Sequence, residues 1–222
     1  MAQFLYERHS TNVHLNIAKR HIRLARQFKG AEELVTAIEP TYNELVIKAA
    51  NSVTASGETE CKRDLLVFTD VSLDDKVRDV NEGCKKYDRD HPGIPVSNLL
   101  FPGGTSPIIF APVESEPSLV ETLILGIQSL GATHPLAVHI APLQAAIKQS
   151  KTAISELHTA IIAEKMADAL ETIAKVNLTR QYEQNIYTAS SKFGKAFANR
   201  LFPQIKATSN GGSTDETPNP TP

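Results

Sequence analysis

Six basic side chains and no acidic one occur between residues 8 and 29. They are Arg8, Lys19, Arg20, Arg23, Arg26 and Lys29. A basic helix of this kind can bind nucleic acid or an anionic membrane surface through its charge. Residues 58–90 offer a competing partner inside the chain, because they hold ten acidic side chains against seven basic ones. The sequence leaves both alternatives open.

Histidine and carboxylate side chains are the next residues that could do chemistry. Asp88 and His91 are three positions apart, a spacing that places two ligands on one helix face for a metal ion. A di-metal helical bundle needs a second such pair, and the matching place later in the chain holds Ala189 and Lys192. We therefore expect no metal and no cofactor, and we keep a helical-bundle metalloprotein or enzyme as the second alternative function.

Sequence motifs of catalysis are absent. The glycine-rich segment PGGTSP at 102–107 lacks the Lys-Ser/Thr pair of a phosphate-binding loop. Neither GxSxG nor HExxH occurs. Cys61 and Cys84 do not form a CxxC motif and predict two small, largely apolar side chains. The sequence therefore favours a protein that is not an enzyme.

The basic side chains lie on an expected amphipathic helix from residue 12 to residue 29, ended by Gly30. We expect His14 and His21 at the edge of its apolar face. Leu15 and Ile22 fall among the cations, so they should be exposed unless a partner covers them. The apolar face holds Val13, Ile17, Leu24 and Phe28. The candidate interaction surface comprises Arg8, Leu15, Lys19, Ile22, Arg23 and Arg26.

Helical periodicity continues after Gly30. A second helix is expected at 31–53, with a bend at Pro40, which removes one amide donor. The segment SGETE at 56–60 predicts a break, and a third helical region follows, with two helices meeting near Asp70. Its apolar stripe holds Leu73, Val77, Val80, Cys84 and Tyr87.

Two short segments occur twice in the chain. LVTAIEP at 34–40 corresponds to LAVHIAP at 136–142, and VSNLLFP at 96–102 corresponds to FANRLFP at 197–203. The nearly constant spacing predicts a tandem duplication of a three-helix unit of about 100 residues. We expect an all-α, pseudo-twofold helical bundle in which the stripes of the two copies pack together in one cooperative domain.

The predicted domains follow from this repeat. The first copy spans 1–104, a proline-rich linker spans 105–116, and the second copy spans 117–206. We expect the second copy to form helices at 117–130, 136–157 and 159–197, with a reversal near His158 and a bend at Pro142. The tail, 207–222, has no large apolar residue and should be disordered. Apolar side chains near the linker should be buried, namely Leu99, Leu100, Phe101, Ile108, Ile109 and Phe110.

The overall composition narrows the classes of function. The formal charge of −2 and the sequence pI near 6.4 give no global preference for a polyanion. The first residues do not resemble a secretory signal, and the longest apolar stretch, 119–130, is too short for a membrane span. We expect a soluble, cytoplasmic scaffold or protein-interaction protein that binds a protein partner or itself. Nucleic-acid or other polyanion binding through the basic first helix is the alternative.

Overall fold

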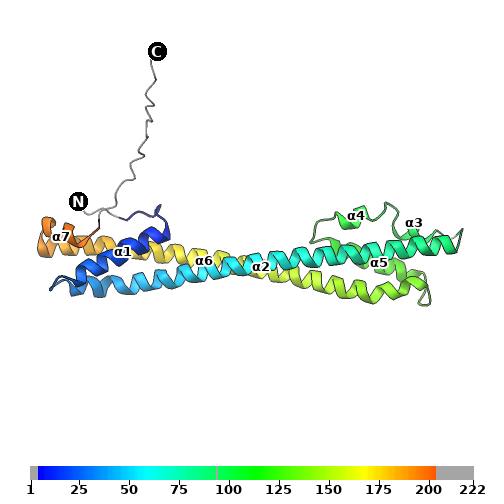
Figure 1. The fold of residues 1–222 in the computed structure, drawn as a ribbon, viewed down its shortest axis with the longest axis horizontal. Coiled ribbons are helices and arrows are strands. Elements are labelled where there is room, and N and C mark those ends of the chain that lie inside the picture. Colours follow the sequence, from blue (N-terminus) through cyan, green and yellow to red (C-terminus); the bar gives the residue numbers. More distant parts are fainter. Residues whose placement is uncertain (1–4, 94, 204–222) are drawn as a thin grey trace, which may run out of the picture. The chain divides into compact units, whose positions relative to one another are not determined.

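The computed structural model describes residues 5–93 and 95–203, and in these residues it is all-helical, without a strand (Figure 1). This confirms the predicted all-α class. The α-helices are α1 (Thr11–Arg26), α2 (Glu32–Asp90), α3 (Val96–Leu100), α4 (Ser106–Ile109), α5 (Glu116–Ser129), α6 (Ile140–Phe193) and α7 (Lys195–Leu201). A 3-10 helix, η1 (Pro135–His139), leads directly into α6. The expected disordered tail, 207–222, lies outside the described residues.

The chain divides into two compact units. Unit 1 comprises residues 1–49 and 171–222, and unit 2 comprises residues 50–170. Each of the two long helices, α2 and α6, contributes to both units. Each unit combines residues from the first half of the chain with residues from the second half. The predicted repeat boundaries, 1–104 and 117–206, stay a prediction.

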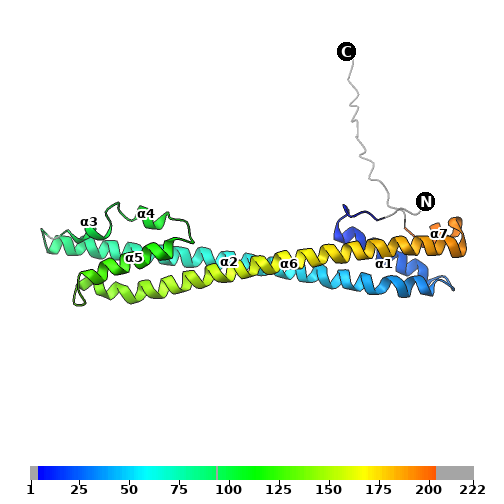
Figure 2. The same ribbon diagram turned by 180° about the vertical axis from the view of Figure 1, so that it is seen from behind.

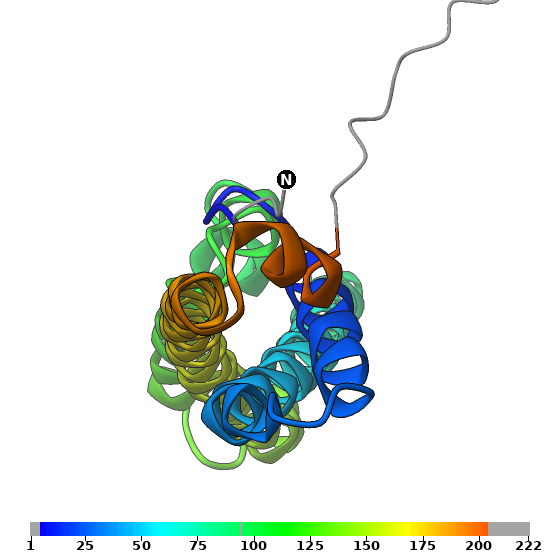
Figure 3. The same ribbon diagram turned by 90° about the vertical axis from the view of Figure 1, so that its left-hand side faces the viewer.

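Unit 1 packs α1 and α7 against the first part of α2 and the last part of α6 (Figure 3). Ser10 caps α1 by accepting a hydrogen bond from the Val13 amide. Gly30, at a φ of 104°, gives the left-handed turn that leads from α1 to α2. The buried core includes Ala18, Ile22, Leu34, Ile38, Leu45, Leu178, Tyr182, Leu201 and Phe202.

Unit 2 packs α5, η1 and the short helices α3 and α4 against the last part of α2 and the first part of α6 (Figure 2). The buried core contains four of the five residues of the predicted stripe on α2, and Tyr87 is partly buried beside them. Its other members include Val96, Phe101, Val120, Leu123, Ile127, Leu136 and Leu143.

The prediction of a break at 56–60 is wrong, because α2 is one continuous helix of 59 residues. Gly57 lowers helix propensity by only about 1 kcal/mol relative to alanine, which tertiary packing can offset. Thr59 is fully buried, and its hydroxyl donates to the Ala55 carbonyl at 3.1 Å, so it needs no partner outside the helix. The predicted junction near Asp70 is likewise absent.

The predicted reversal near His158 is also wrong, because α6 continues from Ile140 to Phe193. The chain reverses instead at the ends of the long helices, where glycine and proline are concentrated. The two repeated prolines occupy different helical positions. Pro40 lies within α2, whereas Pro142 lies in the first turn of α6, where a missing amide donor costs nothing.

The predicted linker, 105–116, contains α4 and the first residue of α5. The burial predicted for the apolar side chains in and near this linker is confirmed only in part. Phe101 is buried and Leu100, Ile108 and Ile109 are partly buried, whereas Leu99 and Phe110 are exposed.

Candidate interaction surfaces

The basic side of α1 is exposed in unit 1. Lys19, Arg20 and Arg23 are exposed, and in the described part of the chain none of the three forms an ion pair. Arg26 pairs with Glu39, and the Arg8 guanidinium lies 5.0 Å from the centre of the Tyr6 ring. The acid-rich segment considered as an internal partner, 58–90, belongs to unit 2. Within unit 1, Lys19, Arg20 and Arg23 have no described anionic partner, so they can bind an external anion.

The apolar part of the predicted surface on α1 is not exposed. Ile22 is 6% exposed and belongs to the core of unit 1, while Leu15 is partly buried against it. The buried stripe of α1 is centred on His14, Ala18 and His21, which places Leu15 and Ile22 on one of its flanks. The prediction that Ile22 is an exposed contact is therefore wrong, and the surface of α1 is cationic rather than mixed.

The position predicted for His21 is also wrong, because its side chain lies at the centre of unit 1. Its Nδ1 lies 2.8 Å from the Leu201 carbonyl, so Nδ1 carries the proton. Its Nε2 accepts from the Asn185 amide at 3.0 Å, and the same amide donates to the Leu34 carbonyl at 2.7 Å. Burial lowers the pKa of His21 to about 4, despite the opposing hydrogen bond to Leu201. This neutral histidine connects α1, α2, α6 and the end of α7.

The side chain of His14 is also buried in unit 1, so the prediction that it lies at the edge of the apolar face of α1 is wrong. Its Nδ1 lies 3.0 Å from the Ser10 carbonyl, and its Nε2 lies 3.1 Å from the Thr179 hydroxyl. Burial is the main reason that its pKa is lowered. His14 and His21 therefore stabilise the unit as neutral groups, and neither is available for a ligand.

Asp88 and His91, which have the spacing of metal ligands, have other partners in unit 2. Asp88 accepts hydrogen bonds from the Val96 amide at 2.7 Å and the Ser97 amide at 3.0 Å, and also from the Ser97 hydroxyl. These bonds lower its pKa and fix the start of α3. His91 stacks on Tyr87. Among residues 5–93 and 95–203, no group of three or more histidine, cysteine or carboxylate side chains is placed to hold a metal ion.

A buried carboxyl group lies at the start of α5. Glu116 is 1% exposed, and burial raises its pKa to about 8, with further contributions from the Asp70 and Asp74 carboxyls. A helix start and a set of carboxylates do not by themselves identify a ligand. We treat Glu116 as a pH-sensitive element of the packing between α5 and α2.

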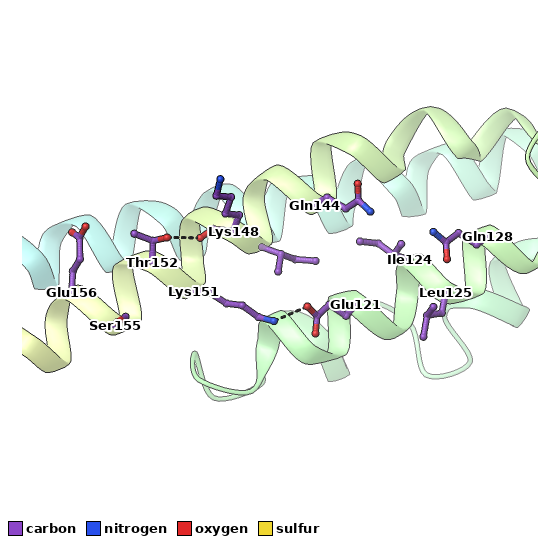
Figure 4. A pocket seen from close by; sticks show the side chains of 11 residues that line it. Glu121, Ile124, Leu125, Gln128, Gln144, Lys148, Lys151, Thr152, Ser155 and Glu156 are labelled. Carbon is purple, nitrogen blue, oxygen red and sulfur yellow. Dashed lines mark hydrogen bonds and ion pairs between the residues drawn. The ribbon is translucent and has the colours of Figure 1, made fainter.

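A groove of about 720 Å³ lies between α5 and α6 in unit 2 (Figure 4). Ile124 and Ile147 are buried in its floor, and Leu125 is 65% exposed at its edge. Lys151 reaches across the groove from α6 and donates to Glu121 of α5 at 2.6 Å. The rest of the lining is polar, namely Gln128, Gln144, Lys148, Thr152, Ser155 and Glu156.

A second groove of about 530 Å³ lies between α2 and α6 in the same unit. Leu65 and Phe68 line it on the α2 side, and Phe68 is 73% exposed. Lys148, Thr152 and Glu156 line both grooves, so the two hollows are separated by one ridge of α6.

Sequence reasoning identified neither groove. A signal was present in the apolar stretch 119–130, which carries too many apolar side chains for one buried stripe. In the structure one side of α5 packs into the core, while Leu119 and Leu125 are exposed.

Comparison with known proteins gives no match. No family model, no curated protein sequence and no solved structure is similar to this chain. In the described residues, no helix has the length and apolar character needed to cross a membrane.

Proposed function

We propose that this protein is a non-enzymatic scaffold that binds an amphipathic helix of a partner protein in the α5–α6 groove. The observation that carries the proposal is the apolar floor at Ile124 and Ile147, flanked by an exposed leucine and a polar rim. An apolar floor with polar edges suits an amphipathic ligand, whose apolar stripe enters the groove while its polar face stays in water.

The dimensions of the groove favour a helical ligand. Its lining on α6 extends from Gln144 to Glu156, and this segment is about 18 Å long at 1.5 Å per residue. That length corresponds to about three turns of a ligand helix, with apolar side chains at positions i, i+4 and i+7.

The charges at the rim define the ligand further. Lys151 is paired with Glu121, and Glu156 is paired with Lys62 at 2.8 Å. Within the described residues, Lys148 forms no ion pair. We therefore expect an acidic side chain next to the apolar stripe of the partner helix.

Site-specific photocrosslinking tests this proposal. A photoreactive amino acid at position 125 in the full chain should capture a segment that is helical and carries the expected apolar spacing. A synthetic peptide of that segment should bind the wild-type chain, and Leu125→Glu should weaken binding at least tenfold. Val138→Glu is the matched control, because Val138 is similarly exposed and lies outside the groove. Equal binding by both variants would overturn the proposal.

We also infer that the two halves of the chain arose by tandem duplication. Residues that are 101 positions apart have similar environments in unit 1 and unit 2. Gly30 and Gly131 have φ values of 104° and 102°. Buried pairs at the same spacing are Leu73 with Ala174, Val77 with Leu178, Cys84 with Asn185, and Phe101 with Phe202.

A segment exchange tests the duplication. Replacing residues 96–102 with the sequence of residues 197–203 should preserve the fold, because each segment provides a short helix that ends at a buried phenylalanine. The same seven residues in scrambled order serve as the control. A loss of the cooperative thermal transition in the exchanged protein, equal to that in the control, would count against the duplication.

Polyanion binding through α1 is a second candidate function. The supporting observation is that Lys19, Arg20 and Arg23 are exposed and form no ion pair with the described residues. A gel shift with single-stranded and duplex probes should weaken steeply with added salt. Lys19→Glu with Arg23→Glu should abolish it, whereas Lys165→Glu in unit 2 should not. Binding that does not respond to salt would remove this candidate.

A further inference from the structure

Several large apolar side chains lie outside the α2–α6 contact in unit 2, within residues 50–70 of α2 and 148–170 of α6. In this part α2 and α6 run antiparallel, because Ser52 donates to Asp168 at 2.7 Å and Lys62 donates to Glu156 at 2.8 Å. Side chains buried in this part of the contact are small, as Thr59 shows. Several large apolar side chains of this segment are exposed, namely Leu65, Phe68, Ile162, Met166 and Leu170.

Four of these side chains, all except Ile162, lie in two clusters on one face of the α2–α6 pair. Leu65 and Phe68 line the α2–α6 groove together with Thr152 of α6. Met166 lies 14 residues after Thr152, and Leu170 lies 14 residues after Glu156, which lines the same groove. Two heptads return a helix to the same side of an antiparallel partner. The Met166–Leu170 cluster therefore continues the face on which the groove opens.

We propose that a second copy of this chain covers this face, so that the α2–α6 pairs of the two copies form a four-helix bundle. The two clusters lie on different helices and at opposite ends of the face. A twofold rotation about an axis that lies between the two faces, perpendicular to the line joining the two clusters, places the Leu65–Phe68 cluster of one copy on the Met166–Leu170 cluster of the other. A surface that is complementary to itself in this way is what a closed, twofold dimer requires.

The size and charge of the face suit a dimer. Two paired helices of about 20 residues present a face about 30 Å long and 20 Å wide. Two such faces bury about 1,200 Å², which reaches the lower bound for a stable interface. Lys62 and Glu156 neutralise each other within one copy, so this pair adds no net charge that would repel a second copy.

Sedimentation velocity of the full chain across a concentration series tests the dimer. The wild type should sediment as a dimer, and Met166→Glu and Phe68→Glu should each weaken association at least tenfold. Both positions are exposed, so the variants should keep the wild-type circular dichroism spectrum. Val138→Glu is the control and should remain dimeric. A monomeric wild type, or a dimer that Met166→Glu leaves unchanged, would overturn the proposal.

Disulfide crosslinking tests the orientation of the two copies. In a Cys61→Ser background, Phe68→Cys combined with Met166→Cys should form a covalent dimer on mild oxidation, while either change alone should not. The two positions lie about 20 Å apart within one copy, too far for an internal disulfide. A dimer that crosslinks equally well through Phe68→Cys alone would contradict the twofold arrangement. Lys148, Thr152 and Glu156 line both grooves, so the two proposals are distinguished by their readouts: sedimentation and crosslinking report the dimer, whereas binding that responds to Leu125→Glu reports the peptide site.

Discussion

Two buried titratable side chains, His21 in unit 1 and Glu116 in unit 2, are displaced toward their neutral forms. Burial lowers the pKa of His21 and raises that of Glu116. His21 has a complete set of hydrogen bonds as a neutral ring, whereas Glu116 lies beside two further carboxyls. The two units should therefore respond in opposite ways to a change in pH.

Acid should destabilise unit 1 through His21. Its pKa is about 4 in the folded chain and 6.5 in the unfolded chain, so the unfolded chain binds more protons between these values. The free energy of unfolding should fall as the pH drops from 6.5 to 4, by up to about 3 kcal/mol. Urea unfolding at several pH values measures this effect. His21→Gln should flatten the dependence, and an unchanged pH dependence in this variant would contradict the assignment to His21.

Rising pH should destabilise unit 2 through Glu116. The folded chain keeps the proton up to a pH of about 8, whereas the unfolded chain loses it near 4.5. The free energy of unfolding should therefore fall as the pH rises from 4.5 to 8. Glu116→Gln should raise stability at pH 8 by about 1–3 kcal/mol and by much less at pH 5. Thermal melts test this, with the exposed Glu82→Gln as control. An equal gain at both pH values would contradict the proposed titration.

At the scale of elements, α2 is helical through Gly57, so we can predict how a substitution at this position changes stability. A Cβ at this position meets no atom within 4 Å, and the backbone is helical. Gly57→Ala should stabilise the chain by about 0.5–1 kcal/mol, because alanine loses less backbone entropy in a helix. Gly30→Ala is the contrasting change and should destabilise the chain, because Gly30 has a φ of 104°. Chemical denaturation measures both, and a destabilising Gly57→Ala would indicate a break at this point.

Hydrophobic periodicity was sufficient to predict the helical class and the stripe from Leu73 to Cys84, because both depend on local spacing. It could not place His21 or Ile22, because the buried side of α1 is centred on histidines and alanine rather than on its largest apolar residues. The break at 56–60 was predicted from propensity, which the packing of Thr59 overrides. The groove needs the relative position of α5 and α6, which no local pattern contains.

At the scale of the molecule, the described residues include two buried cores and also large apolar side chains that are exposed. The buried histidines stabilise the core of unit 1, and the stripe of α2 forms part of the core of unit 2. Leu125 and Phe68 remain in water beside hollows in unit 2. Exposed apolar side chains at the edge of a groove are typical of binding surfaces. We therefore propose that the protein-binding surface lies on unit 2.

Methyl NMR of the full chain, titrated with the peptide captured at position 125, tests this claim most directly. The resonances of Ile124, Leu125 and Ile147 should shift in a saturable way, because these side chains form the floor and edge of the groove. The methyl resonances of Ile22 and Ile38, in the core of unit 1, should not move. Shifts confined to unit 1, with Ile124 and Ile147 unchanged at saturation, would contradict the proposed function.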